Sequence, residues 1–146
     1  MAKGRKKKPA YNQPPPLEKK PHWIEGPTFE GRLLSWRFSS VDAGGPWAWS
    51  KVSSDSLKRI MNKLADFEKA YYDSGIKDLR SIVPTMKLAQ PAKQRLRALQ
   101  RDDIEILYAW RISGKERLWC AEHDGMMCIL WWDPEHEVYP VPKKYT

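Results

Sequence analysis

The sequence contains no long apolar run and few cysteines. No stretch approaches the roughly 18 consecutive apolar residues that a membrane-spanning helix needs, so we expect no membrane association. Two cysteines in 146 residues are too few for a disulfide-stapled secreted scaffold, and the sequence shows no signal-peptide pattern. These absences predict a cytoplasmic protein.

The motifs of common metal and cofactor sites are also missing. There is no Cys-x-x-Cys and no His-Glu-x-x-His, and Gly44-Gly45-Pro46 is too short for a phosphate-cradling loop. The remaining candidate ligands lack zinc-like spacing: His22, His123, His136, Cys120 and Cys128. We therefore expect neither a metal nor a nucleotide cofactor.

Positive charge is abundant but unevenly distributed. The net charge is +8, and residues 1–21 hold seven basic side chains against one acidic one, which leaves 19 basic against 17 acidic elsewhere. Residues 1–22 are rich in lysine and proline and poor in apolar side chains, which predicts a disordered tail, with 23–146 forming a single domain. Lys6, Lys7 and Lys8 could bind nucleic acid through counterion release. The alternative is a solvated arm that only aids solubility.

The first part of this domain mixes one strand pattern with helical patterns. The elements expected from periodicity and from start and stop signals are a strand over 31–38, a helix capped by Asp55 over 55–74, a helical segment over 77–83 and a helix over 91–101. Between the strand and the first helix lies a glycine- and proline-containing loop, in which Trp47 and Trp49 are expected to be exposed.

The last part reads as a three-stranded antiparallel meander. Its strands are expected over 104–112, 117–123 and 126–132, with Asp124-Gly125 forming a type I′ turn. The turns set Trp119 opposite Trp110 and Leu130, and Arg117 opposite Trp132. This register puts Cys120 and Cys128 on opposite faces of the sheet, where they cannot form a disulfide.

The order of these elements predicts an α+β fold. A small antiparallel sheet, made of the N-terminal strand and the C-terminal meander, should pack against two or three helices. Both faces of the meander are largely apolar, so one face should be covered by helices. The other face either packs internally as well or forms a surface rimmed by Arg111, Arg117 and His136.

Residues 107–139 resemble the RelE/ParE-like toxin superfamily. Members often end in a hairpin with an arginine after its glycine turn, here Gly114 and Arg117, followed by an apolar strand, here 128–132. A basic or histidine residue then stands shortly before a tyrosine, here His136 and Tyr139. The resemblance implies cleavage of mRNA in the ribosomal A site for ribonuclease members, and action on DNA gyrase for ParE-like members. It also implies an antitoxin partner.

This chain departs from the ribonuclease pattern at several positions. Asp133 and Glu137 flank His136, and Leu107 and Ala109 stand where basic residues are expected. The departures leave open a catalytically inactive relative, encoded by a phage or a mobile element.

The candidate catalytic residues are Arg117, His136 and Tyr139. Metal-free RNA cleavage needs a base, a cation for the phosphate oxygens and an acid for the leaving oxygen. His136 could serve as base or acid, Arg117 could hold the phosphate, and Tyr139 could stack on a base or donate a proton. The structural alternative is that Arg117 stacks on Trp132, Tyr139 closes the core, and Asp133 caps a turn before Pro134.

Together with the candidate residues, the resemblance implies a RelE-like toxin-superfamily protein, a ribosome-dependent or RNA-directed endoribonuclease neutralised by a partner antitoxin. The alternative is a non-catalytic module that binds nucleic acid or protein on the same fold. In either case the candidate nucleic-acid contacts are Lys6, Lys7, Lys8, Arg111, Lys115, Lys143 and Lys144.

Overall fold

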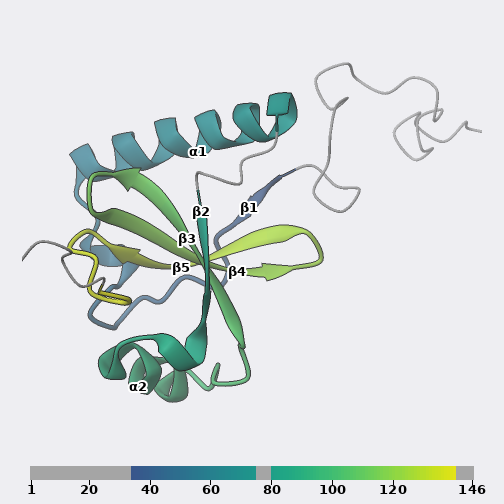
Figure 1. The fold of residues 1–146 in the computed structure, drawn as a ribbon. Coiled ribbons are helices and arrows are strands. Elements are labelled where there is room, and N and C mark those ends of the chain that lie inside the picture. Colours follow the sequence, from purple (N-terminus) through teal and green to yellow (C-terminus); the bar gives the residue numbers. More distant parts are fainter. Residues whose placement is uncertain (1–33, 75–79, 141–146) are drawn as a thin grey trace, which may run out of the picture.

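The computed structural model describes residues 34–74 and 80–140, and in this part of the chain one mixed sheet lies between two α-helices (Figure 1). The elements are β1 (Trp36–Arg37), α1 (Ser54–Ser74), β2 (Arg80–Pro84), α2 (Gln90–Ala98), β3 (Ile106–Ser113), β4 (Glu116–His123) and β5 (Met126–Asp133). Short 3-10 turns occur at Trp49–Lys51 and Thr85–Lys87. The α+β fold class expected from the sequence is confirmed.

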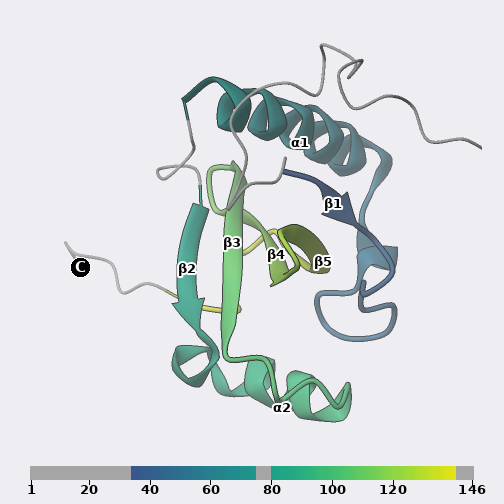
Figure 2. The same ribbon diagram turned by 90° about the vertical axis from the view of Figure 1, so that its right-hand side faces the viewer.

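The strand order is β1-β5-β4-β3-β2, and the meander β3-β4-β5 forms its centre. The prediction of a purely antiparallel sheet was wrong, because β1 pairs with β5 in parallel. This parallel pair is possible because a long crossover, containing α1 and α2, separates the two strands in the chain. Figures 1 and 2 show α1 along one side of the sheet and α2 on the other side.

The second edge strand, β2, was predicted as helix and is a strand where it is described. Ser81 to Pro84 pair antiparallel with Ile106 to Ala109. Ile82 and Val83 are β-branched, and Pro84 biases the residue before it toward extended backbone. Pairing with β3 therefore overrides the weak helical pattern.

Helix α1 presents a clear apolar face to the sheet. Ile60, Leu64 and Phe67 recur at helical spacing and are buried. The cap is two residues earlier than expected: the Ser53 hydroxyl accepts a hydrogen bond from the Ser56 amide at 3.1 Å, whereas Asp55 lies in the first turn.

Helix α2 ends before the expected residue 101. The Arg101 amide donates to the Leu96 carbonyl and the Gln100 amide to the Arg97 carbonyl, with Gln100 at φ 58°. This is the Schellman arrangement, in which glycine usually takes the left-handed position. Because glutamine stands there instead, the sequence carried no stop signal.

Two irregularities in the meander change the predicted register. Around Leu130 the pairing shifts, so Trp119 lies opposite Trp131 rather than Leu130. Near the β3–β4 turn a second shift puts Trp110 opposite Leu118. Trp110 therefore packs in the cluster under α1, whereas Trp119 packs in the cluster near α2. A β-bulge inserts an unpaired residue, and turn residues alone do not reveal it.

The loop before α1 is anchored rather than exposed. Trp47 is 4% exposed and packs against Trp131, with ring centroids 5.2 Å apart, so its predicted exposure was wrong. The buried Asp42 carboxylate accepts hydrogen bonds from Arg95 at 2.7 and 2.8 Å and from the Trp131 indole at 3.0 Å. Trp49 is also partly buried. The hydrogen bonds of Asp42 tie the loop to both α2 and β5.

Both cysteines are buried and free. Cys120 packs in the cluster under α1, whereas Cys128 pairs with Ala121, which packs toward the cluster near α2. Neither described helix is long and apolar enough to cross a membrane.

Candidate functional site at the β3–β4 turn

Two arginines meet at the turn that joins β3 to β4. Arg111 pairs directly with Arg117 across the two strands. Both guanidinium groups donate to the Gly114 carbonyl oxygen, Arg111 through Nε at 3.2 Å and Arg117 through Nη1 at 2.7 Å. Gly114 has φ 50°, a left-handed conformation that glycine adopts without strain. The turn therefore holds two cations side by side.

Within residues 34–74 and 80–140, no carboxylate forms an ion pair with either arginine. Burial lowers the pKa of the Arg117 guanidinium, the charge of Arg111 lowers it further, and Asp133 opposes both effects. Like charges placed directly opposite on neighbouring strands are destabilising. An anion bound between them would remove that repulsion.

His136 lies in the turn that follows β5, and Asp133 holds this turn. The carboxylate of Asp133 is fully buried and accepts hydrogen bonds from the Glu137 amide at 2.8 Å, the Val138 amide at 3.0 Å and the Trp119 indole at 3.1 Å. The predicted capping role of Asp133 is therefore confirmed. His136 has φ 60°, a conformation uncommon outside glycine, and is only partly buried. Its backbone is thus held in place by its neighbours.

The two turns lie at the same end of the sheet. Lys115, in the β3–β4 turn, forms an ion pair of 2.5 Å with Glu135, the neighbour of His136. Arg117 is in register with Asp133, not with Trp132 as predicted, so the suggested stacking on Trp132 has no basis in the pairing. The sequence correctly placed Arg117 and His136 at one end of the sheet. No hydrogen bond joins them in the part of the chain that the structure describes.

The surroundings of Tyr139 differ from those of Arg117 and His136. It packs, partly buried, against the cluster near α2, and the carbonyl of its neighbour Val138 accepts a hydrogen bond from the Ala89 amide at the start of α2. Among the other predicted contacts, Arg111 is exposed beside Arg117, and Lys115 is paired with Glu135. Lys6, Lys7, Lys8, Lys143 and Lys144 lie outside the described residues.

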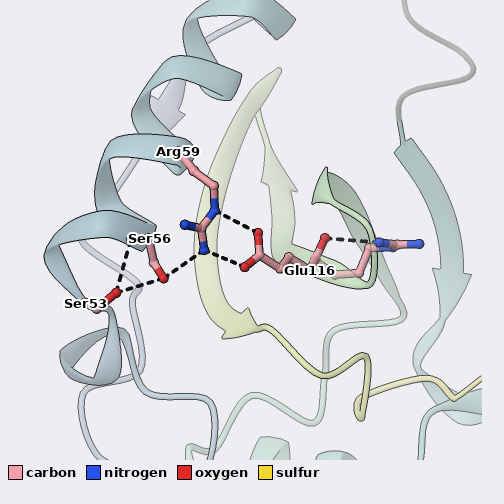
Figure 3. A network of polar contacts seen from close by, with 5 residues as sticks. Ser53, Ser56, Arg59 and Glu116 are labelled. Carbon is pink, nitrogen blue, oxygen red and sulfur yellow. Dashed lines mark hydrogen bonds and ion pairs between the residues drawn. The ribbon is translucent and has the colours of Figure 1, made fainter.

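Sequence reasoning missed a contact between α1 and this turn. The guanidinium of Arg59 donates to Glu116 Oε2 at 2.6 Å and to Oε1 at 3.3 Å (Figure 3). Arg59 also donates to the Ser56 hydroxyl at 3.2 Å, which fixes its orientation. The backbone carbonyl of Glu116 in turn accepts from Arg117 at 3.1 Å. Arg59 and Glu116 are 57 positions apart in the sequence, so no local pattern could have paired them.

A cavity also lies at the opposite end of the sheet, and its lining contains both basic and acidic side chains. Its volume is about 700 Å³, and its lining includes Arg37 and Arg101 but also Asp103, Glu105 and Glu122. Because these three acidic side chains outnumber the two basic ones, this cavity suits a polyanion less well than the arginine pair does. Among the residues described, no group of three or more histidine, cysteine or acidic side chains is arranged to hold a metal ion.

No protein-family model matches the chain, and neither a curated protein nor a solved structure matches it.

Proposed function

We propose that the β3–β4 turn binds the phosphate backbone of RNA and that the protein is a RelE-like toxin-superfamily endoribonuclease. The observation that carries the proposal is the directly opposed pair Arg111 and Arg117, which has no carboxylate partner among the described residues. Within the described part of the chain, Arg111 donates only through Nε, to the Gly114 carbonyl, so both of its terminal nitrogens are available there to phosphate oxygens. Guanidinium groups suit this task because their planar forks match phosphate geometry.

His136 is the residue we assign to proton transfer. Cleavage through the 2′-hydroxyl requires a group that gives or takes a proton near neutral pH, and the ordinary imidazole pKa lies in that range. The ion pair between Lys115 and Glu135 supports this assignment, because it draws the turn containing His136 toward the turn containing the arginines. Arg117 and Arg111 would stabilise the charge that develops on the phosphate.

A neutralising protein partner belongs to the same proposal. A groove of about 430 Å³ runs between β1 and α1, and it is lined by Phe38 and Met61, which are 49% and 61% exposed. Large apolar side chains exposed together often mark protein interaction sites. An antitoxin segment could bury them.

The proposal is tested by expression in a bacterial host followed by mapping of mRNA ends at stalled ribosomes. The wild type should inhibit growth and produce new mRNA ends, and His136→Ala should abolish both while the protein remains folded. Losing a general acid or base costs about 10² to 10⁴ in rate, which is easily separated from small changes in stability. His123→Ala is the matched control, because His123 is exposed at the β4–β5 turn, at the other end of β4. A wild type that leaves growth and mRNA intact would support the non-catalytic binding module instead.

A further inference from the structure

A cavity of about 490 Å³ lies between α1 and the β3–β4 turn. Its lining includes Arg111, one of the arginine pair, and Gly114, whose carbonyl oxygen accepts from both arginines. The cavity therefore adjoins the site at which a phosphate is proposed to bind. Its size and position raise the question of which part of an RNA strand it could accept.

One wall of the cavity comes from a single face of α1. Arg59, Asn62, Lys63 and Asp66 line it, and their spacing of three and four residues puts them on the same side of the helix. Arg59 is fixed by Glu116, as Figure 3 shows. The side chains of Asn62, Lys63 and Asp66 are exposed and form no hydrogen bond or ion pair with any residue that the structure describes. They are available to a ligand.

The inner part of the lining is apolar. Phe67 and Ile112 contribute to it, and they are only 2% and 1% exposed. A cavity with an apolar inner surface and a few polar groups at its wall suits a flat, partly polar ring. Unstacked RNA bases are commonly held in this way, with hydrogen bonds to their edges.

The polar side chains at the wall of the cavity favour some RNA bases over others. A carboxylate such as Asp66 only accepts hydrogen bonds, and an ammonium such as Lys63 only donates them. Guanine combines neighbouring N–H donors on its Watson–Crick edge with the O6 and N7 acceptors, which cations recognise. We infer that this cavity binds a guanine base of the RNA strand whose phosphate lies at Arg111 and Arg117, an inference that rests on the proposed function.

Binding of 2′-O-methylated RNA hexamers to the full chain tests this inference, because such RNA cannot be cleaved through its 2′-oxygen. The hexamers are all uridine, or carry one guanine, adenine or inosine at the same position. The guanine hexamer should bind about tenfold more tightly than the uridine hexamer, as expected for a well-formed pair of contacts to one base. Inosine, which lacks the exocyclic amine of guanine, should lose much of this gain.

Asp66→Asn should reduce the guanine preference to about twofold or less without weakening the uridine hexamer. Glu68→Gln removes the same charge from the same helix but lines the groove beside β1, so it should leave the preference intact. Equal binding of all hexamers, weakened throughout by Arg111→Gln, would overturn the guanine inference and leave the phosphate site standing. A preference that survives Asp66→Asn would overturn the assignment of Asp66. No binding of any hexamer would overturn the proposed phosphate site as well.

Discussion

Arg111 on β3 lies directly opposite Arg117 on β4, and both donate hydrogen bonds to the carbonyl oxygen of Gly114. Neighbouring cations repel, and burial of Arg117 intensifies the repulsion because it reduces screening by water. Arg117 supplies the shorter of the two bonds to Gly114, at 2.7 Å against 3.2 Å for Arg111. Arg111 is therefore the less important of the two for the structure of the turn.

The first prediction is that Arg111→Gln does not destabilise the fold. We expect the free energy of unfolding to stay within about 0.5 kcal/mol of the wild type, or to rise, because the substitution removes repulsion at an exposed position. Urea denaturation at low and high salt measures this. If the repulsion is real, any gain should shrink at high salt. A loss of about 2 kcal/mol or more would mean that Arg111 supports the turn structurally.

The second prediction concerns stability in acid. Hydrogen bonds from Arg95 lower the pKa of the Asp42 carboxyl from its ordinary 3.8 to about 2, although burial opposes the shift. Because the folded pKa lies below the unfolded one, the contribution of Asp42 is fully present above pH about 4 and is lost as the pH falls toward 2. Its size at neutral pH should be on the order of 2 kcal/mol.

Asp42→Asn should therefore lower the free energy of unfolding at pH 7, and the gap from the wild type should narrow between pH about 4 and 2. Chemical denaturation across this range measures the gap. Asp103→Asn, at an exposed site with no ion-pair partner in the described part of the chain, is the control. A gap that is constant with pH would show that Asp42 contributes by shape rather than by charge.

The third prediction concerns the central strand. Trp119 is fully buried, and its indole donates to Asp133, the residue that holds the turn containing His136. Trp119→Ala should destabilise the protein by about 3 to 5 kcal/mol, because it leaves a cavity in the cluster near α2. Trp119→Phe loses the hydrogen bond to Asp133 but keeps an aromatic ring in the cluster, so it should destabilise the protein less than Trp119→Ala does. Equal stability of the alanine variant and the wild type would contradict this packing.

The fourth prediction concerns residues 1–21, which lie outside the described part of the chain. Their sequence contains few apolar side chains, so deleting them should leave the melting temperature nearly unchanged. If the tail contacts RNA, the deletion removes seven cations and should flatten the salt dependence of binding. Identical salt slopes with and without the tail would exclude that role.

Local patterns predicted the long, regular elements and missed the features that depend on distant partners. The periodicity of Ile60, Leu64 and Phe67 located α1, and Asp124-Gly125 located the β4–β5 turn, since both signals lie within a few residues. The strand over 80–84 could not be found in this way, because pairing with β3 decides it. The register shift near the β3–β4 turn moved Trp119 to the opposite cluster from Trp110, and no residue type marks such an irregularity.

The candidate site, like the fold, was predicted only in part from the sequence. Arg117 and His136 were placed at one end of the sheet because each stands close to a predicted turn or strand end in the sequence. The sequence did not reveal that Arg111 shares the Gly114 carbonyl with Arg117, because the predicted register was shifted by one residue. It also gave no sign of Arg59 and Glu116, whose contact joins a helix to a turn far along the chain.

The most direct test of the phosphate site is the affinity for single-stranded RNA as a function of salt concentration, with Arg111→Gln compared against Lys58→Gln. Lys58 is exposed on α1 and carries the same charge, but it does not line the cavity at the β3–β4 turn. We predict that Arg111→Gln weakens binding by about tenfold and reduces the slope of log affinity against log salt by about 0.7, the value expected for losing one phosphate contact, whereas Lys58→Gln changes neither. An affinity and a salt slope unchanged by Arg111→Gln would contradict the central claim that the opposed arginines bind RNA.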